Sequence, residues 1–247
     1  MGLFDKICKR KYFMYSNNEN KKTLHKNLGF TAAEQYKLIR ANIDIILKDH
    51  EKCPVIAVTS SVRGEGKSTT AVNLSYVFAE KESKVLLIDA DLRIPSIARK
   101  LEIESSPGLS ELLSGQGTQI PEFKSFLLSN WFILPSGDVP TNPSELLSSS
   151  RMENLLKQLR EIFDYIIIDL PPVNIVSDAV VISSFISGMI VVIREDYTEK
   201  KELERCFRQL ELSKVNILGC VMNGSKSGSG AYSKYKKHKY YKYYRHY

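Results

Sequence analysis

Residues 54–69 read Pro-Val-Ile-Ala-Val-Thr-Ser-Ser-Val-Arg-Gly-Glu-Gly-Lys-Ser-Thr, and this stretch decides the fold. An apolar, β-branched run leads into a glycine-rich turn, and Lys-Ser-Thr opens the segment behind it, which has a helical pattern. Strand, glycine-rich loop and helix in this order form a P-loop, here with Ser61 where the usual pattern has its first glycine. The alternative to a P-loop is an ordinary glycine-rich turn with surface charges and no ligand. The joint presence of all three parts disfavours it.

This loop predicts a site for a nucleoside triphosphate. Gly64 and Gly66 would let the backbone approach phosphate oxygens without a Cβ in the way, and the positive end of the following helix would face the anion. Lys67 would reach the β- and γ-phosphates, and the Ser68 hydroxyl would bind Mg²⁺. For Asn223, which follows the last predicted strand, a contact with adenine and a plain strand-end turn are both open. The candidate ATP-binding residues are Ser61, Arg63, Gly64, Glu65, Gly66, Lys67, Ser68, Thr69 and Asn223.

Strands and helices alternate through the rest of the central region. Short apolar runs that lack strict alternation are typical of parallel strands covered on both faces. Their alternation with helices implies right-handed crossovers and an open sheet. We therefore predict an α/β fold of the P-loop NTPase kind, doubly wound, with a mostly parallel sheet and helices on both faces. Strands are expected at residues 54–60, 84–89, 132–134, 165–169, 189–193 and 216–222, and helices at 31–47, 67–81, 151–163 and 199–212.

Two of the predicted strands end in aspartates. One ends in Asp89, with Asp91 two residues on, and another ends in Asp169. Because the carboxyl ends of parallel strands share the edge where ligands bind, these carboxylates should gather around the phosphates. Mg²⁺ is the cation expected to offset their mutual repulsion. A mere turn or cap role is the alternative, most open for Asp91. Ser177-Asp178 is interpreted as the N-cap of the next helix rather than as a site.

Charge separates the ends of the chain from its middle. Of the formal charge of +7, residues 224–247 alone supply +7 and residues 1–28 supply +5, which leaves −5 on residues 29–223. An acidic body argues against a basic groove, so no nucleic-acid partner is expected. We predict a basic N-terminal segment over 1–30, one P-loop domain over 31–223, and a flexible C-terminal tail over 224–247.

Cysteine and membrane signals are weak. The four cysteines and four histidines show no paired or metal-ligand spacing, which fits a reducing cytosol. No apolar run reaches the roughly 18–20 residues that a membrane span needs. A cytoplasmic location is expected, with any membrane contact peripheral or through a partner.

Several segments together carry a resemblance to a known family. They are the P-loop, residues 34–43 (Glu-Gln-Tyr-Lys-Leu-Ile-Arg-Ala-Asn-Ile), 87–93 (Leu-Ile-Asp-Ala-Asp-Leu-Arg), 108–113 (Gly-Leu-Ser-Glu-Leu-Leu), 142–147 (Asn-Pro-Ser-Glu-Leu-Leu) and 167–172 (Ile-Ile-Asp-Leu-Pro-Pro). With them, residues 31–223 resemble the cytoplasmic bacterial tyrosine kinases that govern capsule and exopolysaccharide assembly. Leu170 departs from the pattern, because the family more usually has Thr there.

The resemblance implies a kinase with ATP and Mg²⁺ as cofactors. Lys67, Asp89 and Asp91 would be its catalytic residues, with Asp89 as the base that takes the tyrosine proton and Asp91 helping to position metal and substrate. Ser68, Asp89 and Asp169 would form the metal site. The P-loop domain would thus be a protein-tyrosine kinase domain.

The tail would then be a substrate. Seven of the thirteen tyrosines stand in the last sixteen residues, interleaved with lysines. Taken alone, this composition leaves three interpretations open: a phosphorylation substrate, a solvated tail, or a polyanion-binding segment. The P-loop and the family resemblance favour autophosphorylation, at Tyr232, Tyr235, Tyr240, Tyr241, Tyr243, Tyr244 and Tyr247.

The resemblance also implies partners. The family's first-helix pattern Glu-x-x-Arg-x-x-Arg reads Glu34-x-x-Lys37-x-x-Arg40 here and would form the interface of a homo-oligomeric ring of unphosphorylated subunits. Lys37 lacks the planar fork of arginine, which would weaken bidentate pairing. As in the split systems of Gram-positive bacteria, a separate transmembrane modulator would activate the kinase at the inner face of the membrane. A cognate tyrosine phosphatase is expected to reverse the reaction.

A second interpretation comes from another functional class. Septum-positioning and plasmid-partitioning ATPases share the fold but act as nucleotide-dependent dimerisation switches. Their P-loop carries an additional lysine five residues before the P-loop lysine, where this chain has Val62. Their membrane-binding members end in an amphipathic helix, whereas this chain ends in tyrosines.

Overall fold

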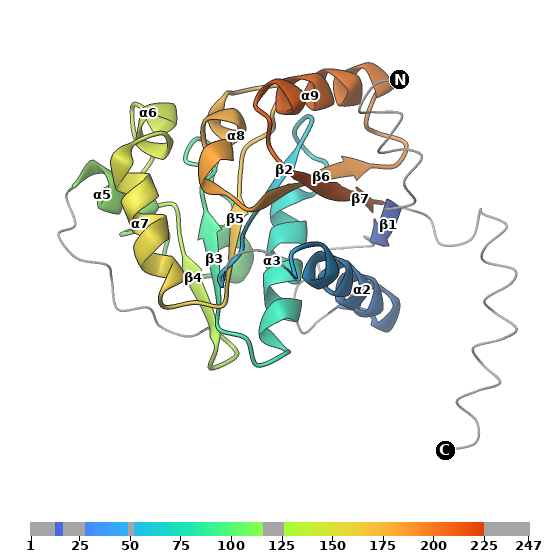
Figure 1. Cartoon of the computed structure of the whole chain (residues 1–247), viewed down its shortest axis with the longest axis horizontal. Helices are drawn as coiled ribbons and strands as arrows, with labels where there is room; N and C mark the ends of the chain where they lie inside the picture. The colour runs from blue at the N-terminus through green and yellow to red at the C-terminus, as the bar shows by residue number, and fades with distance from the viewer. Residues whose placement is uncertain (1–12, 17–27, 49–51, 116–125, 225–247) are drawn as a thin grey trace, which may run out of the picture.

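A single parallel sheet organises the computed structural model of the chain, which describes residues 13–16, 28–48, 52–115 and 126–224 (Figure 1). Within these residues the sheet has seven strands in the order β1-β7-β6-β2-β5-β3-β4, and every neighbouring pair is parallel. The strands are β1 (Phe13–Ser16), β2 (Val55–Ser60), β3 (Val85–Asp89), β4 (Trp131–Leu134), β5 (Tyr165–Asp169), β6 (Gly188–Arg194) and β7 (Ile217–Asn223).

Helices cover both faces of the sheet, and each face has its own apolar core. On one face pack α2 (Phe30–Ile46), α3 (Lys67–Ala79) and α4 (Ile97–Leu101). On the other lie α5 (Leu109–Ser114), α6 (Pro143–Leu147), α7 (Ser150–Arg160), α8 (Asp178–Val181), the short 3-10 helix η2 (Ser183–Phe185) and α9 (Lys200–Leu212). This confirms the predicted doubly wound α/β fold.

Strand β2 shows why the strands lack an alternating pattern. Val55 and Ala57 join the core under α7 and α9, whereas Ile56 and Val58 join the core under α2 and α3. All four side chains are fully buried. Because successive side chains of a strand point to opposite faces, a strand covered on both faces must be apolar throughout. The first four residues of β3 are likewise apolar and buried, and the strand ends in the buried Asp89.

Strand β1 was missed by sequence analysis. It lies within the segment predicted as a basic N-terminal region and pairs in parallel with β7 at the edge of the sheet. Its four residues are too few for a periodicity to emerge from a lysine-rich context. The short helices α4, α5 and α6 were also unpredicted, since five or six residues contain fewer than two helical turns, whereas the start of α8 was expected behind Ser177.

The order of the central strands positions the candidate site. Strand β5 lies between β2, which feeds the P-loop, and β3. Asp89 and Asp169 are partners in the register of β3 with β5, so their carboxylates end adjacent strands. The loops that follow β2, β3 and β5 therefore meet at one place on the carboxyl edge, as expected for an open α/β sheet.

Candidate active site

The P-loop wraps the N-terminus of α3 and needs glycine at two positions. Gly64 and Gly66 have φ of +82° and +97°, the left-handed region that other residues rarely adopt. A Cβ on Gly66 would lie 2.1 Å from Asn223 Nδ2, so no larger residue fits there. The N–H groups at the start of this thirteen-residue helix are thus left open to an anion.

A buried carboxylate inside the loop fixes its shape. Glu65 is only 1% exposed and accepts hydrogen bonds from Ser61 Oγ (2.8 Å) and the Val62 backbone N–H (2.8 Å). The Thr198 hydroxyl, from the segment between β6 and α9, donates a further short hydrogen bond to it. Ser61 and Glu65, predicted as ATP-binding residues, therefore act within the structure as internal braces of the loop. Thr198 was not predicted, because it lies 133 residues away in sequence.

Asn223, at the end of β7, also holds the P-loop in place. Its Nδ2 donates to the Glu65 backbone carbonyl (2.9 Å) and to Thr70 Oγ1 (3.3 Å). Its Oδ1 is buried without a hydrogen-bond partner. An amide oxygen in that condition is an acceptor that a nucleobase amino group could satisfy. The proposed contact with adenine stays a prediction.

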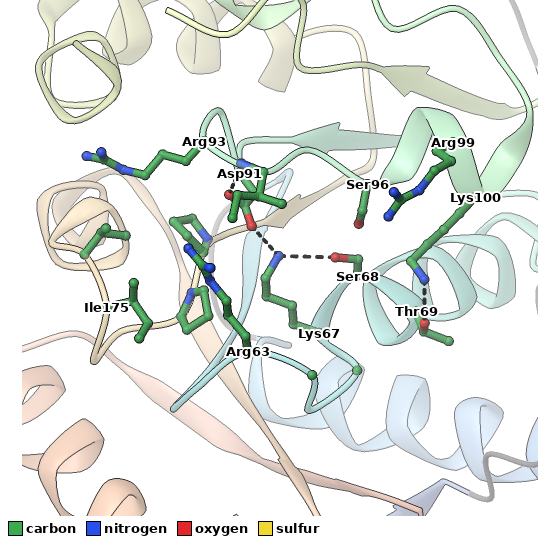
Figure 2. A pocket seen from close by; sticks show the side chains of 16 residues that line it. Arg63, Lys67, Ser68, Thr69, Asp91, Arg93, Ser96, Arg99, Lys100 and Ile175 are labelled. Carbon is green, nitrogen blue, oxygen red and sulfur yellow. Dashed lines mark hydrogen bonds and ion pairs between the residues drawn. The ribbon is translucent and has the colours of Figure 1, made fainter. Parts of the chain in front are cut away.

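Lys67 lies at the centre of the site (Figure 2). Its Nζ is 2.8 Å from Asp91 Oδ2 and 3.4 Å from Asp169 Oδ2, and it donates to Ser68 Oγ at 3.2 Å. Burial lowers the pKa of Lys67, but the Asp169 and Asp91 carboxylates outweigh burial, so its pKa lies above the ordinary value. The structure thus brings together four residues that sequence analysis assigned to the site from three separate segments.

Asp89 lies deeper than Asp91. Its Oδ2 accepts the backbone N–H groups of Ser96 (3.1 Å) and Ile97 (2.9 Å) at the start of α4. Burial and the neighbouring Asp169 carboxylate raise the pKa of Asp89 to about 7, against these two N–H groups and Lys67. Burial also raises the pKa of Asp169, although Lys67 and Ser68 oppose the shift. A carboxyl group poised near neutral pH is suited to take a proton.

A second set of contacts, unpredicted from sequence, holds the loop after β3. Arg93 Nε and Nη2 donate to Asp178 Oδ2 (3.0 Å) and Oδ1 (3.2 Å), and Nη2 also donates to Ser144 Oγ (2.8 Å). The Ser144 hydroxyl in turn donates a short hydrogen bond to Asp178. Ser177 does occupy the predicted N-cap position of α8, but its side chain makes no cap hydrogen bond, and the buried Asp178 carboxylate binds Arg93 instead.

Between the P-loop and these loops lies a cavity of about 430 Å³, within the usual size range of ligand pockets (Figure 2). Four cations besides Lys67 line it, from the P-loop, the loop after β3, and α4: Arg63, Arg93, Arg99 and Lys100. Lys100 Nζ donates to Thr69 Oγ1 at 3.3 Å, and burial lowers its pKa. Neither Arg99 nor Lys100 was predicted from the sequence, since no motif marks them.

The donor set fits a nucleoside triphosphate with a divalent cation. The open N–H groups of α3, Lys67 and the lining cations would bind phosphate oxygens. Ser68 Oγ and the buried Asp169 carboxylate are oxygen ligands of the kind that Mg²⁺ prefers. In the described part of the chain no group of three or more His, Cys, Asp or Glu residues is arranged to hold a metal alone. Phosphate oxygens and water would therefore have to complete the coordination.

The predicted oligomer interface lies on α2. Lys37 Nζ pairs with Glu34 Oε1 at 2.9 Å on the exposed face of that helix, and this hydrogen bond raises the pKa of Lys37. Arg40 is partly buried and donates to the Val77 backbone carbonyl of α3. The seven predicted phosphorylation sites, Tyr232 to Tyr247, lie outside the described residues. Within the described part no helix is both long and apolar enough to span a bilayer.

The fold and this pocket define a P-loop NTPase. A family model described as "ParA: NUBPL iron-transfer P-loop NTPase" matches residues 52–242, most of the chain. Tyrosine-protein kinase YwqD of Bacillus subtilis (strain 168) is 38% identical over 194 residues, which cover 78% of this chain and 81% of that protein. The chain therefore belongs to the bacterial tyrosine-protein kinase family.

Two further comparisons agree. Tyrosine-protein kinase etk of Escherichia coli (strain K12) is 32% identical over 91% of this chain, but the match spans only 32% of that longer protein. The solved structure "The kinase domain of Escherichia coli tyrosine kinase ETK" superposes with a TM-score of 0.78, at 30% identity, and covers 94% of this chain and 91% of that one. This chain thus corresponds to the kinase domain of the longer etk protein and to most of the shorter YwqD protein.

The partitioning-type alternative is less supported. The septum site-determining protein MinD from Pyrococcus horikoshii has a TM-score of 0.60 and 23% identity over 72% of each chain, a likeness that shows the common fold alone. Val62 occupies the position where that class carries its additional lysine. The tyrosine kinases, by contrast, resemble this chain in both fold and sequence.

Proposed function

We propose that this protein is an ATP-dependent protein-tyrosine kinase that phosphorylates the tyrosines of its own C-terminal tail, from Tyr232 to Tyr247. One observation carries the proposal. Lys67 lies within 3.4 Å of the Asp91 and Asp169 carboxylates, beside Ser68, in a chain whose last sixteen residues hold seven tyrosines. The site has what phosphoryl transfer needs, which is mainly positioning and charge neutralisation.

In the proposed reaction the tyrosine oxygen attacks the γ-phosphorus of ATP, and the bond from that phosphorus to the β–γ bridging oxygen breaks, which releases ADP. The phenol has an unperturbed pKa of about 10 and gains from a base as the new bond forms. Asp89 takes the phenolic proton, and Asp91 helps to position the acceptor. Lys67 moves from its carboxylate partners to the β- and γ-phosphates, where its charge stabilises the transition state.

Ser68 and Asp169 would hold Mg²⁺, with Asp89 nearby, and the bound cation would screen the phosphate charge. Asn223 would accept from the adenine amino group through its buried Oδ1. Ser61 and Glu65 would serve ATP binding by bracing the loop, while Arg63, Gly64, Gly66 and Thr69, which line the cavity, would lie along the phosphates.

The tail is proposed as both substrate and switch. It carries +7, whereas residues 29–223 carry −5, so an unmodified tail is attracted to a neighbouring subunit. Each phosphate adds about −1.5 to −2 charges, so four or so would cancel or reverse the tail's charge.

We infer a homo-oligomer, with Glu34, Lys37 and Arg40 at its interface, that dissociates on phosphorylation. By family resemblance the switch regulates capsule or exopolysaccharide synthesis, under a separate transmembrane activator and a tyrosine phosphatase.

Phosphotyrosine mapping tests the activity. The full chain is incubated with Mg-ATP, with and without cytoplasmic segments of candidate activators, and digested for mass spectrometry. Phosphate is expected on tail tyrosines and to be absent from a variant in which all seven are phenylalanine. If wild-type protein acquires no phosphotyrosine with any activator segment, the kinase proposal fails.

Light scattering separates the kinase from a nucleotide switch. The all-Phe tail keeps its +7 charge, so this variant should remain assembled in Mg-ATP while the wild type dissociates. A partitioning-type switch would instead assemble on ATP binding whatever the state of its tail. Equal ATP-driven assembly of both proteins, with no phosphotyrosine on either, would favour the switch.

A further inference from the structure

The cavity beside the P-loop has two chemically different halves. One half, which we call the cationic half, is lined by Ser68, Thr69, Ser96, Arg99 and Lys100. The other, the apolar half, is lined by Ile94, Pro171, Pro172, Ile175 and Val176, and Arg63 and Arg93 lie on the same side of Lys67 in Figure 2. Figure 2 shows Ile175 on the opposite side of Lys67 from Thr69 and Lys100. Lys67 therefore marks the boundary between the halves.

The apolar half leaves large side chains open to solvent. Ile94 and Ile175 are each 49% exposed, although nearly all the large apolar side chains of the central strands are fully buried. They come from different loops, the one after β3 and the one after β5, and line the same cavity. Scattered exposed apolar residues need no explanation, but two that converge beside a reactive group form a surface suited to an apolar ligand.

The apolar half is also held in place. Asp91 Oδ1 accepts the Ile94 backbone N–H at 3.1 Å, so the same residue that pairs with Lys67 positions Ile94. The Pro171 carbonyl accepts from Thr59 Oγ1 at 2.7 Å, and the Asn174 N–H donates to the Ser61 carbonyl at 3.2 Å. These bonds tie the second loop to β2 and the P-loop. A ligand would meet a surface whose geometry is set before binding.

The phosphates belong to the other side of Lys67. A P-loop lysine contacts the β- and γ-phosphates, and the residues after it lie along the α-phosphate. Lys100 hydrogen-bonds Thr69, which extends the positive charge in that direction. The orphaned Asn223 Oδ1, the proposed adenine contact, lies next to Gly66 and Thr70 rather than in the apolar half. The apolar half thus lies beyond the γ-phosphate, on the acceptor's side.

We propose that Ile94, Pro171, Pro172, Ile175 and Val176 form a subsite for the aromatic ring of the acceptor tyrosine, supplied by the tail of a second copy of this chain. The inference rests on the proposed kinase function and specifies its acceptor site. A ring seated there directs its hydroxyl toward Lys67 and the end of β3, where the proposed base Asp89 and the positioning residue Asp91 lie. Serine and threonine have no ring to bury, so the subsite selects tyrosine through the apolar contact.

The tail begins near this pocket. Gly224 follows β7 and packs against Arg194, whose Nη1 donates to the Gly64 carbonyl of the P-loop at 3.2 Å. The 23 residues from 225 to 247 could span up to roughly 75 Å when extended, at about 3.3 Å per residue. The tail of an associated copy can therefore reach the subsite. Tethering by association raises its effective concentration there.

The test uses two full-length proteins. The kinase copy carries alanine at the seven tail tyrosines, and the acceptor copy carries Lys67→Met with an intact tail. Ile94→Ser and Ile175→Ser are combined in the kinase copy, with Ile162→Ser as the matched control, because Ile162 is 40% exposed and does not line the cavity. The readouts are kcat/KM for the acceptor copy and the Kd for Mg-ATP by calorimetry.

The double variant should lower kcat/KM for the acceptor by about tenfold to a hundredfold, mainly through KM, because the ring loses apolar contacts. Its Kd for Mg-ATP should stay within about twofold, and Ile94→Leu with Ile175→Leu should restore activity. Unchanged acceptor kinetics would overturn the subsite alone. An equal loss of ATP affinity would place adenine in the apolar half and also overturn it. A kinase copy with intact isoleucines that phosphorylates no tyrosine would overturn the proposed function and the subsite together.

Discussion

The two walls of the pocket are built in different ways. The P-loop wall is one continuous segment, residues 61–68, and two of its own residues brace it: the buried Glu65 binds Ser61 Oγ and the Val62 N–H. The opposite wall, residues 89–100, is held at its base by Asp89 and at its tip by Arg93. Arg93 in turn depends on Asp178, 85 residues further along the chain.

This difference suggests a division of labour. Thr198, Asn223 and Arg194 also donate hydrogen bonds to the P-loop wall, but its central brace, Glu65, lies within the loop itself. A wall anchored through Arg93 to α6 and α8 is coupled to the rest of that face of the domain. The first wall, with Arg99 and Lys100 opposite it, should therefore determine ATP binding. The tip of the second wall, around Arg93 and Ile94, should determine how well the acceptor is positioned for transfer. Variants that affect one wall and spare the other test this division.

The largest effect is expected at the boundary of the two walls. Lys67→Met should lower the rate of phosphotyrosine formation by at least about a thousandfold, since the transferring phosphate loses its main protein-borne positive charge. Lys157→Met, at an exposed lysine of α7, is the control and should match wild type. The initial rate is measured with labelled ATP. Full activity of Lys67→Met would refute the proposed site.

The second-largest effect is expected at Asp89, at the base of the second wall. Asp89→Asn should lower transfer by about 10² to 10⁴, the usual range for loss of a general base, while the Kd for Mg-ATP changes only a few-fold. Asparagine keeps an oxygen for the Ser96 and Ile97 N–H groups, so the wall should stay in place. Single-turnover transfer and calorimetry give the two quantities. If ATP affinity falls as far as transfer does, Asp89 chiefly organises the metal.

The sequence predicted the P-loop wall because its chemistry is local. Gly64, Gly66, Lys67 and Ser68 are contiguous, and their spacing alone specifies the turn and its ligand. Asp89 and Asp169 could be placed with it because each ends an apolar strand, and parallel strands end at a common edge. The boundaries of the six predicted strands were right to within one residue, whereas β1 was missed.

The second wall could not be predicted in the same way. Arg93, Ser144 and Asp178 come from three segments whose proximity is set by tertiary packing, and none has a distinctive local pattern. Asp178 does stand at the start of a helix, which favoured the cap interpretation, but burial beside Arg93 gave it another partner. Thr198, which donates to Glu65, and Lys100, which donates to Thr69, were missed because hydrogen bonds between distant segments leave no spacing to detect.

A smaller effect is expected inside the P-loop wall. Glu65→Gln keeps the shape of the side chain but removes a charged acceptor from the three donors Ser61, Val62 and Thr198, at a cost of roughly 1–3 kcal/mol in the free energy of unfolding. ATP affinity should fall about tenfold as the loop loosens, and the KM for the acceptor should change little. Urea unfolding and calorimetry measure these quantities, with the exposed Glu161→Gln as control. A weakened acceptor KM with normal ATP affinity would contradict the division between the walls.

The smallest effect is expected at the tip of the second wall, where Asp178→Asn removes the charge that anchors Arg93. Asparagine can still accept one hydrogen bond, and the Arg93 side chain is 37% exposed, so its freed charge can be solvated. The loss of stability should therefore stay near 1 kcal/mol, well below that of a fully buried pair. Transfer should fall by about threefold to tenfold through a higher KM for the acceptor, because Ile94 adjoins Arg93 on the same loop, while the Kd for Mg-ATP stays at its wild-type value.

Ser144→Ala removes only one of the contacts to Arg93 and should give a weaker change of the same kind. If Asp178→Asn weakens ATP binding and leaves the acceptor KM unchanged, the second wall serves the nucleotide and the proposed division of labour is wrong.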